Sequence, residues 1–271
     1  MARFPTAPPE PENAPAGGVR SVSRALQLLQ LMARTERSSW SLDEMSRLSG
    51  LAKSTVHRLL ETMIAGGFVE HAVAPGYYRL GLQAAVVGSA SVRLRRPEQK
   101  VQQTLDAVRA RTDEYVGLAV LSADHAVTVA RSVSQRPWRR EIDVGGIFPA
   151  HACAGGKVLL AGLPEVELEH RFRGRDKLAR YTHTTITCVG DLLSQLTLIR
   201  SHGYALDDEE YRVGLRCIGV PVPSAAGAPM HCLGVSVPAE RAEPGRLLLM
   251  LPLLRAAAGD LSMALALEAM R

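Results

Sequence analysis

The sequence predicts an α+β protein with two domains, a small helical module that ends in a β-hairpin and a larger domain that mixes hairpins with helices. Two short amphipathic helices joined by a tight glycine turn, followed at once by two β-rich runs, predict the first module. Irregular alternation of apolar β runs and helical segments beyond Pro97 predicts the second domain. With 271 residues the chain is long enough to form both hydrophobic cores.

Composition narrows the class of protein. Hydrophobic residues make up 46% of the chain and charged residues 22%, as in a typical globular protein, and no apolar run of about 18 residues predicts a membrane span. Residues 1–18 are rich in proline and lack the apolar core of a signal peptide, so we expect a disordered tail and a cytoplasmic location. The four cysteines show no C-x-x-C spacing, which argues against a disulfide framework or a zinc finger. A formal charge of +5 permits nucleic-acid binding without requiring it.

The first module opens with three predicted helices. Apolar residues recur at helical spacing from Val22 to Ala33, and Ser41 and Glu44 form a capping box that opens the second helix. Gly50 provides the left-handed residue that ends the second helix, and the third helix runs from Lys53 to Ala65. The second and third helices therefore form a helix-turn-helix.

The third helix has two different faces. Val56, Leu60 and Met63 form an apolar stripe that we expect to turn inward. The polar residues Ser54, His57, Arg58 and Glu61 fall outward, with Lys53 and Thr55 near the N-terminal end of the helix. Such side chains can enter the major groove of DNA, which is about 12 Å wide. The runs 68–71 and 77–80 predict a hairpin wing, which favours DNA binding over the alternative of a solvated three-helix subdomain.

The second domain is predicted over residues 97–271, after the winged module at 19–81 and a linker helix at 82–96. Strands are predicted at 115–121, 126–133, 141–144, 204–206, 216–222 and 230–237. Helices are predicted around Val101, Leu105 and Val108, at 153–162, from Pro164, around 192–199, and over 246–270 as one long helix or two broken near Pro252.

Three separated motifs resemble IclR-type transcription regulators. The run GLAKSTVHRLL at 50–60, with YRLG at 78–81, resembles the winged helix of that family, which usually has proline in place of Ala52. Residues 148–161 and 203–222 are similar to two diagnostic stretches of its ligand-binding domain. The resemblance implies a C-terminal GAF-like effector-binding domain, assembly as a homodimer or homotetramer, and a double-stranded DNA operator as partner.

The same resemblance implies the residues that contact DNA. They are Lys53, Ser54, Thr55, His57 and Arg58 in the third helix and Arg79 in the wing. Arg58 is the candidate for a base contact, because a guanidinium can donate two hydrogen bonds to guanine O6 and N7. Lys53 and Ser54 lie near the helix start, where phosphate binds, and Arg79 would contact the backbone or the minor groove.

In the second domain the resemblance implies an effector site. Its residues are Phe148, as an apolar wall, with Ala154, Gly155, Asp207, Cys217 and Ser236. The backbone at 154–156 is nearly bare at a helix start, so its N–H groups can bind a carboxylate. Family members often carry a second serine where this chain has Gly234, so we expect an organic acid that is larger or less hydrophilic than a short oxo-acid.

Three rival sites fail on spacing or context. The run Gly155–Val158 lacks the P-loop spacing and ends without the hydroxyl that a P-loop needs. Cys217, His151 and Asp207 could form a thiol catalyst or a metal site, but a cysteine in an apolar strand usually only packs. The acidic run 207–210 lacks the spacing of a calcium loop, so we expect Asp207 to face the effector and the other three residues to be solvated or paired with arginines across an interface. We therefore predict no catalytic residue, no metal and no cofactor.

These features predict a transcription regulator that binds DNA and responds to a small organic acid bound by its C-terminal domain. The alternative is a small-molecule-binding enzyme whose accessory winged helix makes only protein contacts. Duplex DNA binding that weakens steeply with salt would separate the two, because phosphate contacts release counterions.

Overall fold

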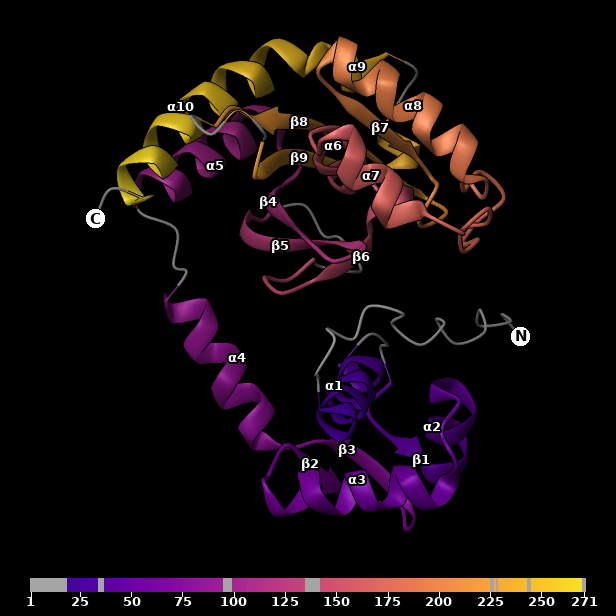
Figure 1. Ribbon diagram of the computed structural model, residues 1–271. Helices are drawn as coiled ribbons and strands as arrows, with labels where there is room; N and C mark the ends of the chain where they lie inside the picture. Colours follow the sequence, from indigo (N-terminus) through magenta and orange to yellow (C-terminus); the bar gives the residue numbers. More distant parts are fainter. Residues whose placement is uncertain are drawn as a thin grey trace. The chain divides into compact units, whose positions relative to one another are not determined.

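The computed structural model describes residues 19–33, 37–94, 99–134, 142–224, 227, 229–242 and 245–269. The chain divides into two compact units, one up to Leu94 and one from Arg95 (Figure 1). The tail predicted at 1–18 and the last two residues of the predicted linker, 95–96, lie outside the described residues. No described helix combines the length and the apolar character needed to cross a membrane.

The N-terminal unit is a winged helix-turn-helix. Its elements are α1 (Arg20–Ala33), β1 (Trp40–Ser41), α2 (Leu42–Ser49), α3 (Lys53–Ala65), β2 (Val69–His71) and β3 (Tyr77–Leu80), followed by α4 (Leu82–Leu94). The predicted capping box is confirmed: Ser41 Oγ accepts a hydrogen bond from the N–H of Glu44, whose side chain accepts one from the N–H of Ser41. Gly50 ends α2 with φ at 71°, as predicted.

One strand of the wing was not predicted. The wing is a three-stranded antiparallel sheet in the order β1-β3-β2, because Trp40 pairs with Tyr78 and Ser41 with Tyr77. Two residues are too few to produce an alternating pattern, so the sequence did not reveal β1. The added strand ties the start of α2 to the wing.

The C-terminal unit is built on one antiparallel sheet of six strands. In spatial order they are β6 (Ile147–Pro149), β5 (His125–Ser132), β4 (Tyr115–Ser122), β9 (His231–Pro238), β8 (Leu215–Val222) and β7 (Ala205–Asp208). Its helices are α5 (Gln99–Thr112), η1 (Ala150–Ala152), α6 (Ala154–Ala161), α7 (Glu165–Phe172), α8 (Val189–His202), η2 (Ala239–Arg241), α9 (Arg246–Leu249) and α10 (Leu251–Ala269). The C-terminal segment therefore forms two helices, as one of the two alternatives predicted.

The strand predicted at 141–144 is wrong. Glu141 lies outside the described residues, and residues 142–144 are not a strand. The chain turns at Val144 and Gly145, where φ is 86°, and the strand forms only afterwards as β6, which pairs antiparallel with β5. The glycine turn therefore comes before the strand and not after it.

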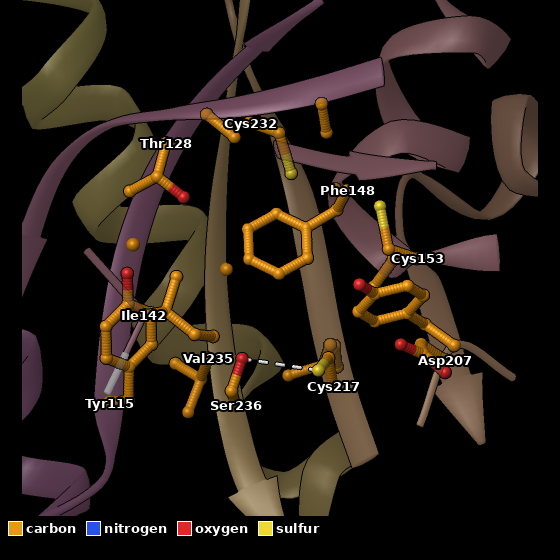
Figure 2. A pocket seen from close by; sticks show the side chains of 18 of the residues that line it. Tyr115, Thr128, Ile142, Phe148, Cys153, Asp207, Cys217, Cys232, Val235 and Ser236 are labelled. Carbon is orange, nitrogen blue, oxygen red and sulfur yellow. Dashed lines mark hydrogen bonds between the residues drawn. The ribbon is translucent and has the colours of Figure 1, made fainter. Parts of the chain in front are cut away.

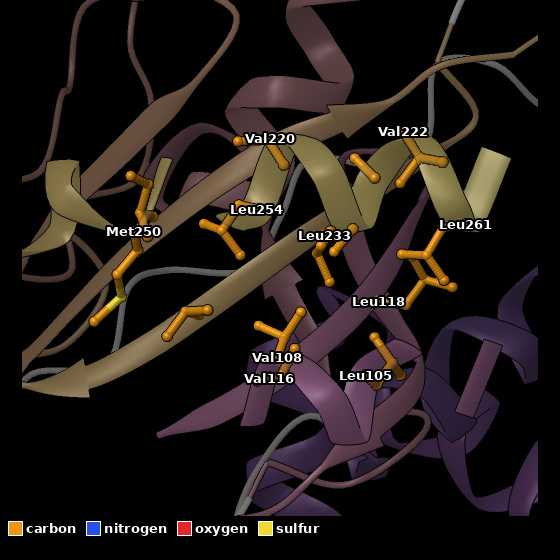
Figure 3. Close-up of a cluster of buried hydrophobic side chains, with 14 of the residues drawn as sticks. Leu105, Val108, Val116, Leu118, Val220, Val222, Leu233, Met250, Leu254 and Leu261 are labelled. Carbon is orange, nitrogen blue, oxygen red and sulfur yellow. The ribbon is translucent and has the colours of Figure 1, made fainter. Parts of the chain in front are cut away.

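Two apolar layers cover the two faces of the sheet. On one face, α5 and α10 pack against the strands through residues such as Leu105, Val116 and Leu254, all completely buried (Figure 3). On the other face, α6 and α8 form a second core with residues such as Leu160 and Leu192. A cavity lies on this second face, where α6 begins above the sheet.

An ion cluster fixes the join between α5 and β4. Glu114 lies between these two elements and is 1% exposed. Its carboxylate accepts hydrogen bonds from Arg241 Nε at 3.2 Å and Nη2 at 2.6 Å, and Arg246 Nη2 lies 3.6 Å away. The following residue, Tyr115, lines the cavity. Two half-buried arginines, Arg241 and Arg246, thus hold the chain directly beside the cavity wall.

Candidate functional site

The first candidate surface is the polar face of α3. The apolar stripe turns inward as predicted, since Val56 and Leu60 are completely buried and Met63 is 7% exposed. Four of the predicted contact residues in α3 are exposed, namely Lys53, Ser54, His57 and Arg58, while Thr55 is half-buried and Arg79 in β3 is exposed. The face proposed for DNA is therefore open on this unit.

Two cations of this surface form ion pairs with neighbouring acidic residues. Lys53 Nζ lies 2.8 Å from Asp43, and Arg79 Nε lies 2.6 Å from Glu70. Both pairs are well exposed to solvent, so each contributes little to stability and can exchange for a phosphate. Arg58 takes part in none of the ion pairs between described residues, which leaves its guanidinium available.

The second candidate site is the cavity at the start of α6. All six residues proposed for the effector site line it: Phe148, Ala154, Gly155, Asp207, Cys217 and Ser236. Figure 2 labels four of them, Phe148, Asp207, Cys217 and Ser236. Its void measures about 590 Å³, including the part that opens to solvent. Further lining residues that the sequence did not predict include Tyr115, Thr128, Cys153, Tyr211 and Cys232.

Strand register explains why distant motifs converge on this cavity. Asp207 in β7 lies opposite Cys217 in β8, Cys217 opposite Ser236 in β9, and Ser236 opposite Tyr115 in β4. Side chains directly opposite one another on antiparallel strands point to the same face of the sheet. These four residues therefore form one polar row across four strands, and Cys217 Sγ donates a hydrogen bond to Ser236 Oγ at 3.2 Å (Figure 2).

The cross-strand row next to this polar row is formed by glycines, which have no side chains. Gly234 in β9 lies opposite Gly117 in β4, each two residues from the polar row, and both line the cavity. A Cβ atom added at Gly234 would meet only the carbonyl oxygen of Ile218, at 3.4 Å. The cavity floor is therefore bare backbone at Gly234, whereas at Gly117 the ring of Tyr115 lies over the backbone, with its Cε1 3.0 Å from the position of an added Cβ atom.

The start of α6 forms one wall. Cys153 is the N-cap residue, and its Sγ accepts a hydrogen bond from the N–H of Gly156 at 3.3 Å. The first residues of a helix have N–H groups without acceptors inside the helix, and Ala154 and Gly155 stand in that position against the cavity. Burial raises the pKa of the Cys153 thiol to about 12, so this sulfur is a neutral thiol at physiological pH.

A buried ion pair lies behind the cavity, and it corrects the interpretation of the acidic run. Asp208 and Glu209 pair with Arg216 of the neighbouring strand β8, within the same unit and not across an interface. Glu210, however, is neither solvated nor paired with arginine: it is 6% exposed, and its Oε1 lies 2.5 Å from Nζ of the fully buried Lys157. The partners are 53 residues apart in the sequence, so no local pattern could have predicted them.

Asp207 links this ion pair to the cavity. It is 2% exposed, and its Oδ1 accepts a hydrogen bond from the N–H of Glu210 at 2.7 Å. Burial is the main cause that raises the pKa of Asp207 to about 7, and the negative charge of Glu210 adds to it. His151 makes its hydrogen bond away from this network, since its Nε2 lies 3.0 Å from the carbonyl oxygen of Ala179. Among the described residues, no cluster of three or more histidine, cysteine or acidic side chains is placed to hold a metal ion.

A winged helix-turn-helix joined to a separate unit with a small-molecule cavity defines a transcription regulator with a ligand-binding domain. The family model for the bacterial transcriptional regulator IclR C-terminal domain matches residues 93–263, and that for the IclR helix-turn-helix domain matches residues 21–72. The chain belongs to the IclR family of bacterial transcriptional regulators.

Individual relatives agree with the family. The chain is 36% identical to the transcriptional repressor IclR of Escherichia coli K12 over 213 residues, which cover 78% of this chain and 77% of that protein. It is 31% identical to the transcriptional repressor AllR of Salmonella typhimurium over 261 residues, covering 96% and 95%. Among solved structures, the inducer-binding domain of PobR from Acinetobacter, a double mutant in complex with 3-hydroxybenzoic acid, is 33% identical with a TM-score of 0.55, covering 59% of this chain and 94% of that one.

Proposed function

We propose that the cavity of the C-terminal unit binds an organic acid and that this binding changes the affinity of the N-terminal unit for an operator. One observation carries the proposal: residues from segments as far apart as Phe148, Asp207 and Ser236 line one cavity. The regulators among the relatives supply the DNA-binding half of the proposal.

The cavity favours a planar acid. On the cavity floor the ring of Tyr115 lies over Gly117 and the backbone is bare at Gly234, and the aromatic rings of Phe148 and Tyr211 also line the cavity. An aromatic ring can rest on such a floor while its carboxylate meets the polar row and the N–H groups of α6. The PobR domain that holds 3-hydroxybenzoic acid makes this compound the first probe to use.

Replacing Asp207 with alanine tests the ligand half. We expect DNA binding to stay intact and the response to 3-hydroxybenzoate to be lost, because Asp207 is the buried polar group that faces the cavity. Asp208→Ala is the matched control, since Asp208 is exposed and pairs with Arg216. The measurement is operator affinity with and without the acid, and a normal response of the Asp207 variant would show that the site is elsewhere.

For the DNA half we propose that α3 enters the major groove with Lys53, Ser54, Thr55, His57 and Arg58, while Arg79 reaches the backbone or the minor groove. Arg58→Ala should weaken specific operator binding by about 1–3 kcal/mol, or about 5- to 150-fold, if Arg58 grips a guanine. Arg111→Ala removes the same charge from an exposed position of the C-terminal unit and should leave affinity unchanged. Equal losses in both variants would mean that Arg58 acts only through net charge.

Salt dependence tests the enzyme alternative with the same assay. A regulator that neutralises several phosphates binds duplex DNA less tightly as salt rises, with a steep linear slope of log affinity against log salt. An enzyme with a protein-contacting winged helix would bind duplex DNA weakly at every salt concentration. We further propose a homodimer or homotetramer in the cytoplasm, because paired half-sites need two α3 helices about 34 Å apart.

A further inference from the structure

No cation lines the cavity in the described part of the chain, and the guanidinium on the same face of the sheet, that of Arg131 opposite Gly117, lies 2.8 Å from Asp143. Among the described residues that line the cavity there is no lysine, arginine or histidine. The nearest ammonium, on Lys157, is fully buried behind the wall and holds Glu210 at 2.5 Å. The second carboxylate oxygen of Glu210 is buried without a hydrogen-bond partner among the described residues, so this pair has no positive charge to spare.

Asp207 is the carboxyl that lines the cavity, and three parts of the chain place charged or titratable groups next to it. From α6 and its cap come Lys157 and the thiol of Cys153, from β8 comes the thiol of Cys217, and from the segment after β7 comes Glu210. Burial raises the pKa of both thiols, which are therefore neutral. The fixed charges around Asp207 are thus one lysine and one glutamate, and the glutamate has the larger effect on Asp207.

We propose that a carboxylate ligand enters this cavity together with one proton, which is held between its own oxygen and Asp207. The proposal rests on the proposed function, since it describes the site that binds the acid. An ionised ligand beside an ionised Asp207 would place two negative charges in a cavity whose described lining residues carry no cation, and two carboxylates in that position share one proton. The proton comes from solvent and forms an O–H bond on Asp207, which then donates a hydrogen bond to the ligand.

The direction of the pH dependence follows from this proton. Without ligand the pKa of Asp207 is about 7, so Asp207 is mostly protonated at pH 6 and mostly ionised at pH 8. An anionic ligand raises that pKa further, so binding takes up about 0.1 proton at pH 6 and about 0.9 proton at pH 8. The affinity for the carboxylate should therefore fall about tenfold from pH 6 to pH 8.

Titration calorimetry of the full-length protein with 3-hydroxybenzoate tests this. Measurements at pH 6 and pH 8, each in two buffers of different ionisation enthalpy, give the affinity and the number of protons taken up. Asp207→Asn should bind with equal affinity at both pH values and take up no proton, because its amide donates the hydrogen bond permanently. A control ligand, 3-hydroxybenzamide, should bind the unmodified protein without proton uptake, since it carries no charge.

Each outcome decides the proposal. Equal affinity at the two pH values with no proton uptake by the unmodified protein would overturn it, even though the cavity would still be the ligand site. Failure of 3-hydroxybenzoate to bind at either pH would contradict the proposed ligand class instead. In that case the pH titration of the ¹³C carboxyl resonance of Asp207 tests the proposal, and this resonance is assigned by its absence in Asp207→Asn. A titration midpoint near 7 supports the proton-sharing carboxyl, and one close to the ordinary value of 3.8 overturns it.

Discussion

Replacing Lys157 with methionine is expected to lower the free energy of unfolding of the C-terminal unit by about 3–5 kcal/mol. Lys157 is completely buried, and its ammonium is the partner of the buried carboxylate of Glu210. Without the ammonium, Glu210 is left as a charge in an apolar surrounding, and this costs far more than the loss of a surface pair. Urea unfolding of the full chain, followed by circular dichroism, measures the change.

The double variant Lys157→Met/Glu210→Met is the control for this result. It removes both charges and keeps side chains of similar length, so it should regain most of the stability that the single variant loses. The hydrogen bonds that Glu210 accepts from Thr182 and Thr185 go to its backbone oxygen and are kept. A double variant as unstable as the single one would mean that packing, and not charge, explains the loss.

The second large effect is expected at Gly156, where alanine should destabilise the C-terminal unit by about 3 kcal/mol. A Cβ atom there would lie 2.3 Å from the Cα of Ala150 and 2.4 Å from its carbonyl oxygen, so α6 would have to move away from η1. Because both obstacles are backbone atoms, no side-chain rotation relieves the contact. The midpoint of urea unfolding measures the loss.

Gly155→Ala provides the matched comparison one residue earlier. Its Cβ atom would have Ala119 Cβ and Cys232 Sγ at 3.8 Å as nearest neighbours, which is ordinary contact. Alanine is also the better helix former, so the fold should be kept. The new methyl group would stand in the cavity wall, and we expect binding of 3-hydroxybenzoate to weaken about tenfold or more. A Gly155 variant as unstable as the Gly156 variant would contradict the wall geometry described here.

The DNA-binding unit could be predicted from its sequence because its signals are local. The capping box at Ser41, the glycine stop at Gly50 and the apolar stripe from Val56 to Met63 all lie within one or two helical turns of what they determine. The strand β1 was not predicted because two residues are too few to show an alternating pattern of apolar and polar side chains. The polar side of α3 followed from the same stripe, since a helix that buries one face must expose the other.

The cavity was only half predictable. Its residues in the family-like motifs could be named, but their meeting in one row depends on the register of β7, β8, β9 and β4. Tyr115 completes that row and was missed, because a tyrosine at the start of an apolar strand carries no local sign of a site. Lys157 and Glu210 were missed for a further reason: charged residues are rarely buried, so the sequence alone favours the surface for both.

The ion cluster at Glu114 connects the cavity wall to α5, so it determines how a movement of the wall displaces this helix. Tyr115, on the cavity wall, follows Glu114 directly, and α5 ends only two residues before it, at Thr112. The 14 residues of α5 make a rigid rod about 21 Å long. With Arg241 and Arg246 clamping Glu114, this rod is anchored at the end nearest the ligand. We expect a ligand that shifts Tyr115 to tilt the rod about that anchor, so that a small displacement at the fixed end becomes a larger one at Gln99.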